Sequence, residues 1–175
     1  MSRRLILLRH TKSDWPDGIA DHERPLGRRG LADAPRIGSY IETHGLIPDF
    51  AVVSTARRTR ETWDLVEQEF SRSVPTRFDR RIYEAKPGAL LYVARETEPS
   101  VGTLLLVGHN PGFEDLARFL IGGGSEEARE RLAQKYPTGG LAVIDFDIGD
   151  WRDIETRSGS LNRFVTPRSL ADEED

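Results

Sequence analysis

The chain of 175 residues contains no cysteine and only one methionine. Without cysteine there is no disulfide framework, no thiolate zinc site and no thiol nucleophile. Long hydrophobic runs are also missing. The apolar run near the N-terminus, residues 5–8, follows two arginines and ends at Arg9. This run falls far short of the roughly 18 residues of a membrane helix, and it is too short for a secretory signal. We therefore expect a cytoplasmic protein with no membrane partner.

The composition is that of an ordinary globular protein, with 37% hydrophobic and 31% charged residues. The length suits one domain with a sizeable core. Neither an internal repeat nor a linker indicates a second domain, so we expect a single α/β domain over residues 1–170. The last four residues are all acidic, and residues 171–175 are predicted to form a solvated acidic tail.

Charge is distributed unevenly along the chain. Residues 1–60 contain 11 Lys and Arg against 7 Asp and Glu, whereas residues 61–175 contain 14 against 22, which together give the net charge of −4. A locally basic first third in an acidic protein favours a small anionic ligand. Nucleic-acid binding would favour a globally basic domain or a basic stripe interleaved with aromatic residues, so no nucleic-acid partner is expected.

Short apolar runs predict strands, and segments of helical periodicity lie between them. The expected strands cover residues 4–8, 50–53, 103–107 and 141–146. The first and third runs show no polar alternation, which is typical of central strands that are buried on both faces. Strands that alternate with helices predict a three-layer α/β/α sandwich with a mostly parallel central sheet.

Apolar residues at three- to four-residue steps predict the helices. The expected helices lie around residues 31–44, 63–70, 90–94 and 113–121, and a polar fifth helix starts after Ser125 and ends before Pro137. Pro35 predicts a kink or a late start for the first of them. Trp63 and Phe113 are predicted core residues. The three glycines at 122–124 are predicted to stop the fourth helix and to form a flexible loop.

Unusual polar residues follow three of the expected strands. The first strand leads to Arg9 and His10, the second to Ser54 and then Arg57, Arg58 and Arg60, and the third to His109 and Asn110. Ligands of open α/β sheets bind outside the carboxyl ends of the strands, so we expect these side chains to meet. The long charged loop at residues 13–29 follows the first strand directly, and such loops are often functional.

Two histidines and several arginines at one site point to phosphate chemistry. The planar guanidinium binds phosphate oxygens in bidentate fashion, and the helix that follows Pro111 offers free N–H groups. A histidine nitrogen can attack phosphorus and form a covalent phosphohistidine. A second, protonated histidine would stabilise charge on the transferring group, and a carboxylic acid, for which Glu84 is the candidate, would protonate an oxygen leaving group.

Five segments resemble motifs of the histidine phosphatase superfamily, in the family's order. Residues 7–13 (LLRHTKS) resemble its Arg-His-Gly signature, with Thr11 in the third position. Residues 54–62 resemble the block in which an Arg precedes a Thr by four positions, which selects Arg58 rather than Arg57. Residues 107–111 resemble the block with the second histidine, and residues 24–30 and 136–140 resemble the SixA-type, short-chain branch.

This resemblance implies a phosphoglycerate-mutase-like fold in which His10 becomes phosphorylated and Arg9, Arg58 and His109 form the phosphate pocket. Glu84 matches the family's proton-donor block only loosely. SixA-type members can lack that acid, because a phosphohistidine substrate offers a nitrogen leaving group. No cofactor is implied. The chain is too short for the lid of the sugar-phosphate members, which favours an open site and a bulky or protein-borne substrate.

The resulting hypothesis is a metal-independent phosphatase that acts on phosphohistidine of a partner protein through a covalent intermediate on His10. A phosphatase of small phosphomonoesters such as sugar phosphates is the enzymatic alternative, and a mutase is a third. A binding module that recognises phosphate without turnover is the alternative from another class. Paired histidines also occur in zinc sites, but zinc takes three or four protein ligands and the neighbouring arginines would repel a dication.

Overall fold

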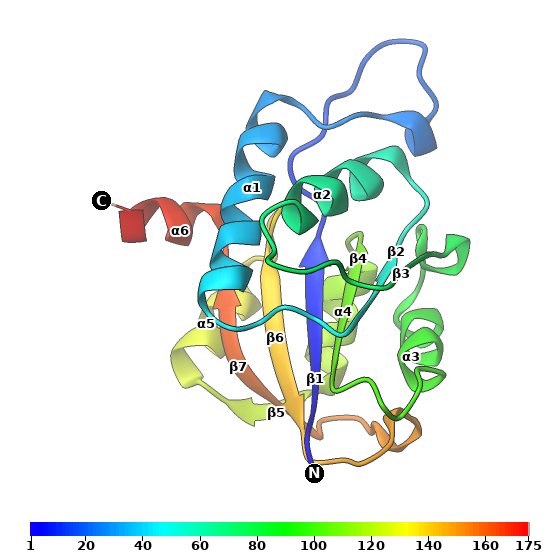
Figure 1. Cartoon of the computed structure of the whole chain (residues 1–175), viewed down its shortest axis with the longest axis vertical. Helices are drawn as coiled ribbons and strands as arrows, with labels where there is room; N and C mark the ends of the chain where they lie inside the picture. The colour runs from blue at the N-terminus through cyan, green and yellow to red at the C-terminus, as the bar shows by residue number, and fades with distance from the viewer. Residues whose placement is uncertain (175) are drawn as a thin grey trace.

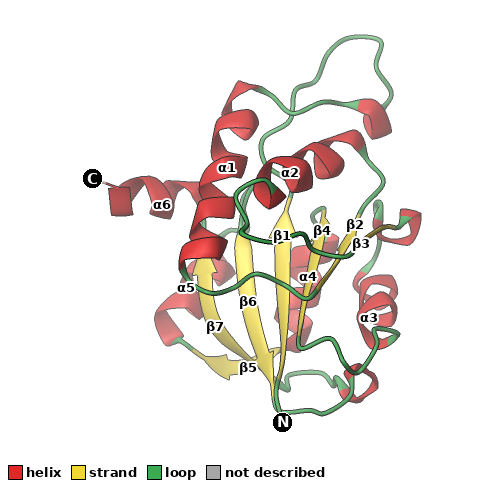
Figure 2. Ribbon diagram, viewed as in Figure 1, coloured by secondary structure: helices red, strands yellow, loops and turns green. Residues whose placement is uncertain are grey.

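A seven-stranded sheet forms the middle of the molecule (Figures 1 and 2). The structure, a computed structural model, describes residues 1–174 and the side chains of residues 1–172. Across the sheet the strands lie in the order β3-β2-β4-β1-β6-β7-β5. Their bounds are β1 (Arg3–Arg9), β2 (Phe50–Val53), β3 (Thr76–Phe78), β4 (Thr103–Gly108), β5 (Ile121–Gly124), β6 (Leu141–Phe146) and β7 (Gly159–Val165).

Most of the neighbouring strands are parallel. β1 pairs in parallel with β4, β4 with β2, and β2 with β3. β6 pairs in antiparallel fashion with both β1 and β7, while β5 is parallel to β7. Among the described strands β6 alone therefore runs against the others, and the predicted mostly parallel sheet is confirmed. The carboxyl ends of β2, β4 and β1 consequently lie side by side at one edge.

Helices cover both faces of the sheet. They are α1 (Arg28–Thr43), α2 (Arg57–Glu67), α3 (Pro87–Arg95), α4 (Gly112–Leu120), α5 (Glu126–Gln134) and α6 (Pro167–Glu174). Alternate residues of β1 belong to two separate apolar clusters: Leu5 and Leu7 pack with α3, α4 and α5, whereas Ile6 and Leu8 pack with α1, α2 and α6. A strand buried on both faces explains the unbroken apolar run, and the predicted three-layer sandwich is confirmed.

The first helix differs from the prediction. α1 begins at Arg28, well before Pro35, so the expected late start is wrong. Proline lacks an N–H group and removes one helical hydrogen bond. The buried stripe of Ala34, Ile37 and Ile41 continues past the proline against the sheet, and the packing of this stripe outweighs the lost bond. Leu31 lies off the stripe and is exposed.

The glycines at 122–124 are part of an edge strand, so the expected flexible loop is wrong. α4 does end at Leu120, as predicted, but the chain continues as β5 along β7. A Cβ atom on Gly122 would lie 1.9 Å from the carbonyl oxygen of Arg157, and Gly124 has φ +103°. Glycine is required here by close backbone approach and by positive φ, neither of which is visible without the distant partner strand.

The four predicted strands correspond to β1, β2, β4 and β6, and the five predicted helices correspond to α1 to α5. Trp63 and Phe113 are buried core residues, as predicted. Ser125 caps α5 by accepting a hydrogen bond from the N–H of Ala128 at 3.2 Å. The strands β3 and β7, the helix α6, and three short 3₁₀ helices at η1 (Asp21–Glu23), η2 (Arg80–Ile82) and η3 (Trp151–Asp153) were not predicted.

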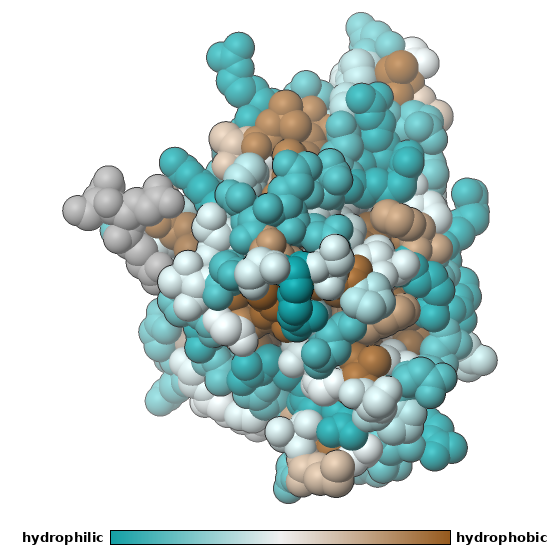
Figure 3. Space-filling model, in the orientation of Figure 1, coloured by the Kyte–Doolittle hydropathy of each residue, from teal (hydrophilic) through white to brown (hydrophobic). Residues whose placement is uncertain are grey.

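The C-terminal segment lies beside α1, away from the edge where β1, β2 and β4 end (Figure 1). α6 extends through residues 171–174 of the predicted acidic tail; the side chains of residues 173–175 and all of Asp175 lie outside the described residues. The face that carries α1 and α2 is mostly hydrophilic, with apolar residues in separate patches (Figure 3). No helix within residues 1–174 is long and apolar enough to cross a membrane.

Candidate active site

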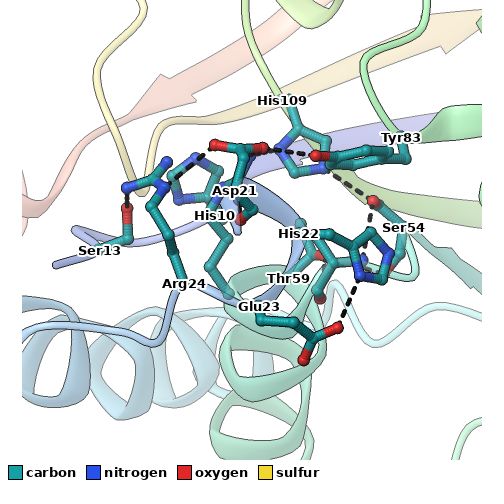
Figure 4. Close-up of polar contacts among 12 residues, drawn as sticks. His10, Ser13, Asp21, His22, Glu23, Arg24, Ser54, Thr59, Tyr83 and His109 are labelled. Atoms are coloured by element: carbon teal, nitrogen blue, oxygen red, sulfur yellow. Dashed lines mark hydrogen bonds and ion pairs between the residues drawn. The ribbon is translucent and has the colours of Figure 1, made fainter. Parts of the chain in front are cut away.

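His10, Ser54 and His109 lie directly after β1, β2 and β4, at the edge where these adjacent strands end (Figure 4). The rings of His10 and His109 are both buried, and their centroids are 5.5 Å apart. Arg58, in the first turn of α2, reaches the same place and lies within 3.3 Å of His109 Nδ1. The predicted meeting of strand-end residues therefore occurs.

The tautomer of His10 follows from a single hydrogen bond. Its Nδ1 lies 2.7 Å from the backbone carbonyl oxygen of Thr11. A carbonyl can only accept, so Nδ1 carries the hydrogen and Nε2 keeps the lone pair. Burial first, and then the cationic Arg58 and Arg9, lower the pKa of His10 to about 3 against the opposing hydrogen bond to Thr11. The ring is therefore neutral at neutral pH, with Nε2 available as a nucleophile.

The segment that carries His10 is fixed by both helices of one layer. The hydroxyl of Thr11 donates to the carbonyl of Gly30 in α1 at 3.0 Å, and the N–H of Thr11 donates to Thr62 Oγ1 in α2 at 3.1 Å. Thr62 Oγ1 in turn donates to the carbonyl of Arg58 one helical turn earlier, at 2.7 Å. The spacing of four between Arg58 and Thr62 thus ties Arg58 and the segment of His10 to one face of α2.

His109 has the opposite tautomer to His10. A guanidinium can only donate, so His109 Nδ1 accepts from Arg58 and Nε2–H donates to Ser54 Oγ at 2.7 Å. Burial, followed by His10 and Arg58, lowers the pKa of His109 to about 3. In the free protein the second histidine is neutral, because burial beside cations disfavours the charged ring. That it is protonated beside a transferring phosphoryl group stays a prediction. The positive charge of the site comes from arginines.

The arginines are held by backbone carbonyls. Arg58 Nη1 donates to the carbonyl of Asp21 at 2.8 Å, and Arg9 Nη1 donates to the carbonyl of Tyr136 at 2.9 Å. The Nε–H groups of both are buried without a partner in the described part of the chain. Buried donors normally have an acceptor, and a phosphoryl oxygen suits two adjacent guanidinium groups. Arg57 instead is exposed and pairs with Glu61 at 3.4 Å.

The motif at residues 136–140 joins the ends of β1 and β4. The carbonyl of Tyr136 accepts from Arg9 and also from Asn110 Nδ2 at 3.0 Å. The side-chain hydroxyl of Tyr136 donates to the carbonyl of Leu7 in β1 at 2.5 Å, and the N–H of Gly139 donates to the carbonyl of His10 at 2.9 Å. This motif therefore positions Arg9 and the backbone of His10.

Three residues of the site were not assigned from the sequence: Asp21, Arg24 and Tyr83. The loop at residues 13–29 brings Asp21 over the histidines, where its carboxylate accepts from Arg24 Nε at 3.1 Å, Arg58 Nη2 at 3.2 Å and Tyr83 Oη at 2.5 Å (Figure 4). Burial opposes ionisation, but the hydrogen bonds from Tyr83 and Arg24 and the charge of Arg58 lower the pKa of Asp21 to about 2. In the sequence, the charge and length of the loop were the features that could have indicated Asp21 and Arg24 as site residues.

Glu84 stands apart from this cluster. It is exposed, has φ 54°, and forms no hydrogen bond to the residues above within the described chain. It lies on the rim of a cavity of about 350 Å³ that also borders His109, Lys86 and Asp115. The structure thus places Glu84 on an approach to His109 rather than in contact with His10. Among the residues with described side chains, no group of three or more His, Asp and Glu could hold a metal ion.

The sequence profile of the histidine phosphatase superfamily (branch 1) matches residues 5–144. The chain belongs to this superfamily. An uncharacterized protein of Mycobacterium tuberculosis is 37% identical over 163 residues, which cover 92% of this chain and 100% of that protein.

Two solved structures resemble this histidine phosphatase closely. The SixA protein of Nakamurella multipartitia has a TM-score of 0.84 at 25% identity, covering 95% of this chain and 97% of that one. The SixA protein of Agrobacterium tumefaciens has a TM-score of 0.78 at 28% identity, covering 94% and 99%. The similarity to the SixA-type branch and the phosphoglycerate-mutase-like fold are therefore confirmed.

Burial of the two neutral histidines is expected to destabilise the protein in mild acid. Their pKa is 6.5 in the unfolded chain and about 3 in the folded one. Between these values the unfolded state binds more protons, so the free energy of unfolding falls as the pH falls, whereas above pH 6.5 both states are neutral. From about pH 6.5 to about pH 4.5, urea titrations should show a loss of up to about 2–3 kcal/mol per histidine.

The variant His109→Gln removes one of these groups and should show a shallower dependence of stability on pH than the parent. His44→Gln is the matched control, because His44 is exposed and stacks on Tyr40 outside the site. An unchanged slope in His109→Gln would contradict the assignment of a buried, neutral His109.

Proposed function

We propose that this histidine phosphatase hydrolyses phosphohistidine on a partner protein through a covalent intermediate on His10. The observation that carries the proposal is the hydrogen bond from His10 Nδ1 to the carbonyl of Thr11, which leaves the lone pair of Nε2 free. This nitrogen belongs to a buried pocket with His109, Arg9 and Arg58. A neutral nucleophile among cations suits attack on an anionic phosphoryl group.

In the first step Nε2 of His10 forms a bond to phosphorus while the P–N bond of the substrate breaks. The electron pair stays on the leaving imidazole nitrogen, and an imidazole protonated on its other nitrogen departs neutral. In the second step water attacks phosphorus and the P–Nε2 bond breaks, which releases inorganic phosphate and free His10. Arg9 and Arg58 stabilise the phosphoryl charge, a role that metal ions have in other phosphoryl transfers.

Two further observations support a phosphohistidine substrate. The SixA proteins of Nakamurella multipartitia and Agrobacterium tumefaciens carry names that propose phosphohistidine phosphatase activity. Glu84, the candidate proton donor, forms no hydrogen bond or ion pair with His10 or His109 in the described chain, and a nitrogen leaving group does not require that donor.

A phosphatase of small phosphomonoesters is the second candidate. It is favoured by the cavity of about 350 Å³ that joins Glu84 to His109, because a carboxylic acid there could protonate an oxygen leaving group.

Removal of the nucleophile should abolish turnover. We expect wild-type protein to release phosphate from a phosphohistidine protein in the presence of a chelator, and His10→Ala to release none above background. Wild-type protein should also acquire an acid-labile covalent phosphate that His10→Ala lacks. His44→Ala serves as the control and should retain activity. Full activity in His10→Ala would exclude the mechanism, and loss of wild-type activity in chelator would exclude metal independence.

The neighbouring residues Arg57 and Arg58 provide a control variant and a test variant for the phosphate contact. Arg58 is buried against His109, whereas Arg57 is exposed and pairs with Glu61. Arg58→Ala should therefore lower kcat/KM by at least about 100-fold, while Arg57→Ala should change it less than about twofold. Equal effects of the two variants in steady-state assays would show that the assigned phosphate contact is incorrect.

Glu84→Gln separates the two candidate substrates. If Glu84 protonates oxygen leaving groups, the variant should lose about 100-fold in turnover of an alkyl phosphate, which has a poor leaving group, and little in turnover of phosphohistidine. Parallel kcat measurements on both substrates give the answer. Unchanged alkyl phosphate turnover would remove Glu84 from the reaction.

A further inference from the structure

The carboxylate of Asp21 binds Arg58, which the proposed function assigns to phosphate binding, and also the neighbouring Arg24. Its Oδ1 accepts from Arg24 Nε and its Oδ2 from Arg58 Nη2, with Tyr83 completing the set. Figure 4 shows the carboxylate between Arg24 and Tyr83, above His10. A carboxylate that accepts from two arginines makes the same charge-assisted bonds as a phosphoryl group.

The hydrogen bonds of Arg58 indicate that it cannot bind the Asp21 carboxylate and a bidentate phosphate at the same time. Nη2 has two N–H groups, and Asp21 Oδ2 at 3.2 Å and His109 Nδ1 at 3.3 Å use them. The Nε–H of Arg58 is buried and has no partner in the described structure. A phosphate that forks across Nε and Nη2 must therefore replace one of the present acceptors. Asp21 is the one that phosphate repels.

The loop that carries Asp21 allows its side chain to leave. The backbone is tied down by the bridge between Ser13 and Leu26 and by a 2.9 Å bond between His22 Nε2 and Thr55 Oγ1. The side chain of Asp21, in contrast, is 39% exposed, although its partners Arg24 and Arg58 are almost fully buried. A rotation of this side chain into solvent releases both guanidinium groups without moving the loop.

We propose that Asp21 is an internal competitor for the phosphoryl group. In the free protein its carboxylate orients Arg24 and Arg58; phosphate displaces this carboxylate, and the carboxylate returns to help expel the product. This inference rests on the proposed function and assigns Asp21 and Arg24 to the control of phosphate affinity.

Binding of inorganic phosphate, measured by calorimetry, tests the competition. Asp21→Asn keeps the shape but removes the charge, and it should bind phosphate about tenfold more tightly than wild type. Glu23→Gln is the matched control, since it removes a carboxylate from the same 3₁₀ helix, and within the described residues this carboxylate is hydrogen-bonded to His22 alone. It should bind as wild type does.

Equal or weaker binding by Asp21→Asn would overturn the competition and leave Asp21 as a residue that merely positions the arginines. Absence of phosphate binding in all three proteins would instead overturn the proposed function. Circular dichroism of each variant establishes that it is folded.

Trp15 provides a second readout in the wild-type chain. Its ring is 74% exposed and lies 3.5 Å from the Arg24 guanidinium, whereas Trp63 and Trp151 are buried. When phosphate displaces the Asp21 carboxylate from Arg24, the fluorescence of Trp15 should change, and Trp15→Phe should lose this response. A wild-type emission spectrum unchanged by saturating phosphate would contradict the displacement.

Discussion

The hydrogen bond from His10 Nδ1 to the carbonyl of Thr11 is the interaction on which the proposed chemistry of this protein depends. It selects the tautomer in which Nε2 keeps its lone pair. The bond can form only because Thr11 is itself held, through its hydroxyl by α1 and through its N–H by α2. A central strand and two helices of one layer thus cooperate to orient a single ring nitrogen, which is a general advantage of building a site on regular elements.

The electrostatics of the site follow from how its arginines are held. Burying a charge costs free energy unless the charge is hydrogen-bonded. Arg9 and Arg58 make such bonds to the backbone carbonyls of Tyr136 and Asp21, which satisfy the donors without cancelling the positive charge. The same positive charge, added to burial, lowers the pKa of both histidines. The pocket is therefore cationic through arginine while its imidazoles stay neutral, and Asp21 is the one carboxylate hydrogen-bonded to these guanidinium groups in the described structure.

Much of this site could be predicted because short-range patterns specify it. Apolar runs ending in His10, Ser54 and His109 place these residues at strand ends, and parallel neighbours bring strand ends together. The choice of Arg58 over Arg57 came from the resemblance to the family motif in which an Arg precedes a Thr by four positions. The structure gives the reason: one residue along a helix turns the side chain by about 100°. Arg58 thereby faces the histidines and Arg57 faces solvent.

By itself, the sequence determined the strands β1, β2, β4 and β6, the helices α1 to α5, the layered fold, and the meeting of His10, Arg58 and His109. Tertiary structure alone decided that the glycines of β5 pair with β7, that His109 is neutral, and that Asp21 and Arg24 belong to the site. The physical reason is the separation along the chain of the groups that interact. Periodicity reports which face of an element is buried, whereas pairing of an edge strand and the protonation of a buried ring depend on groups brought together from distant parts of the chain.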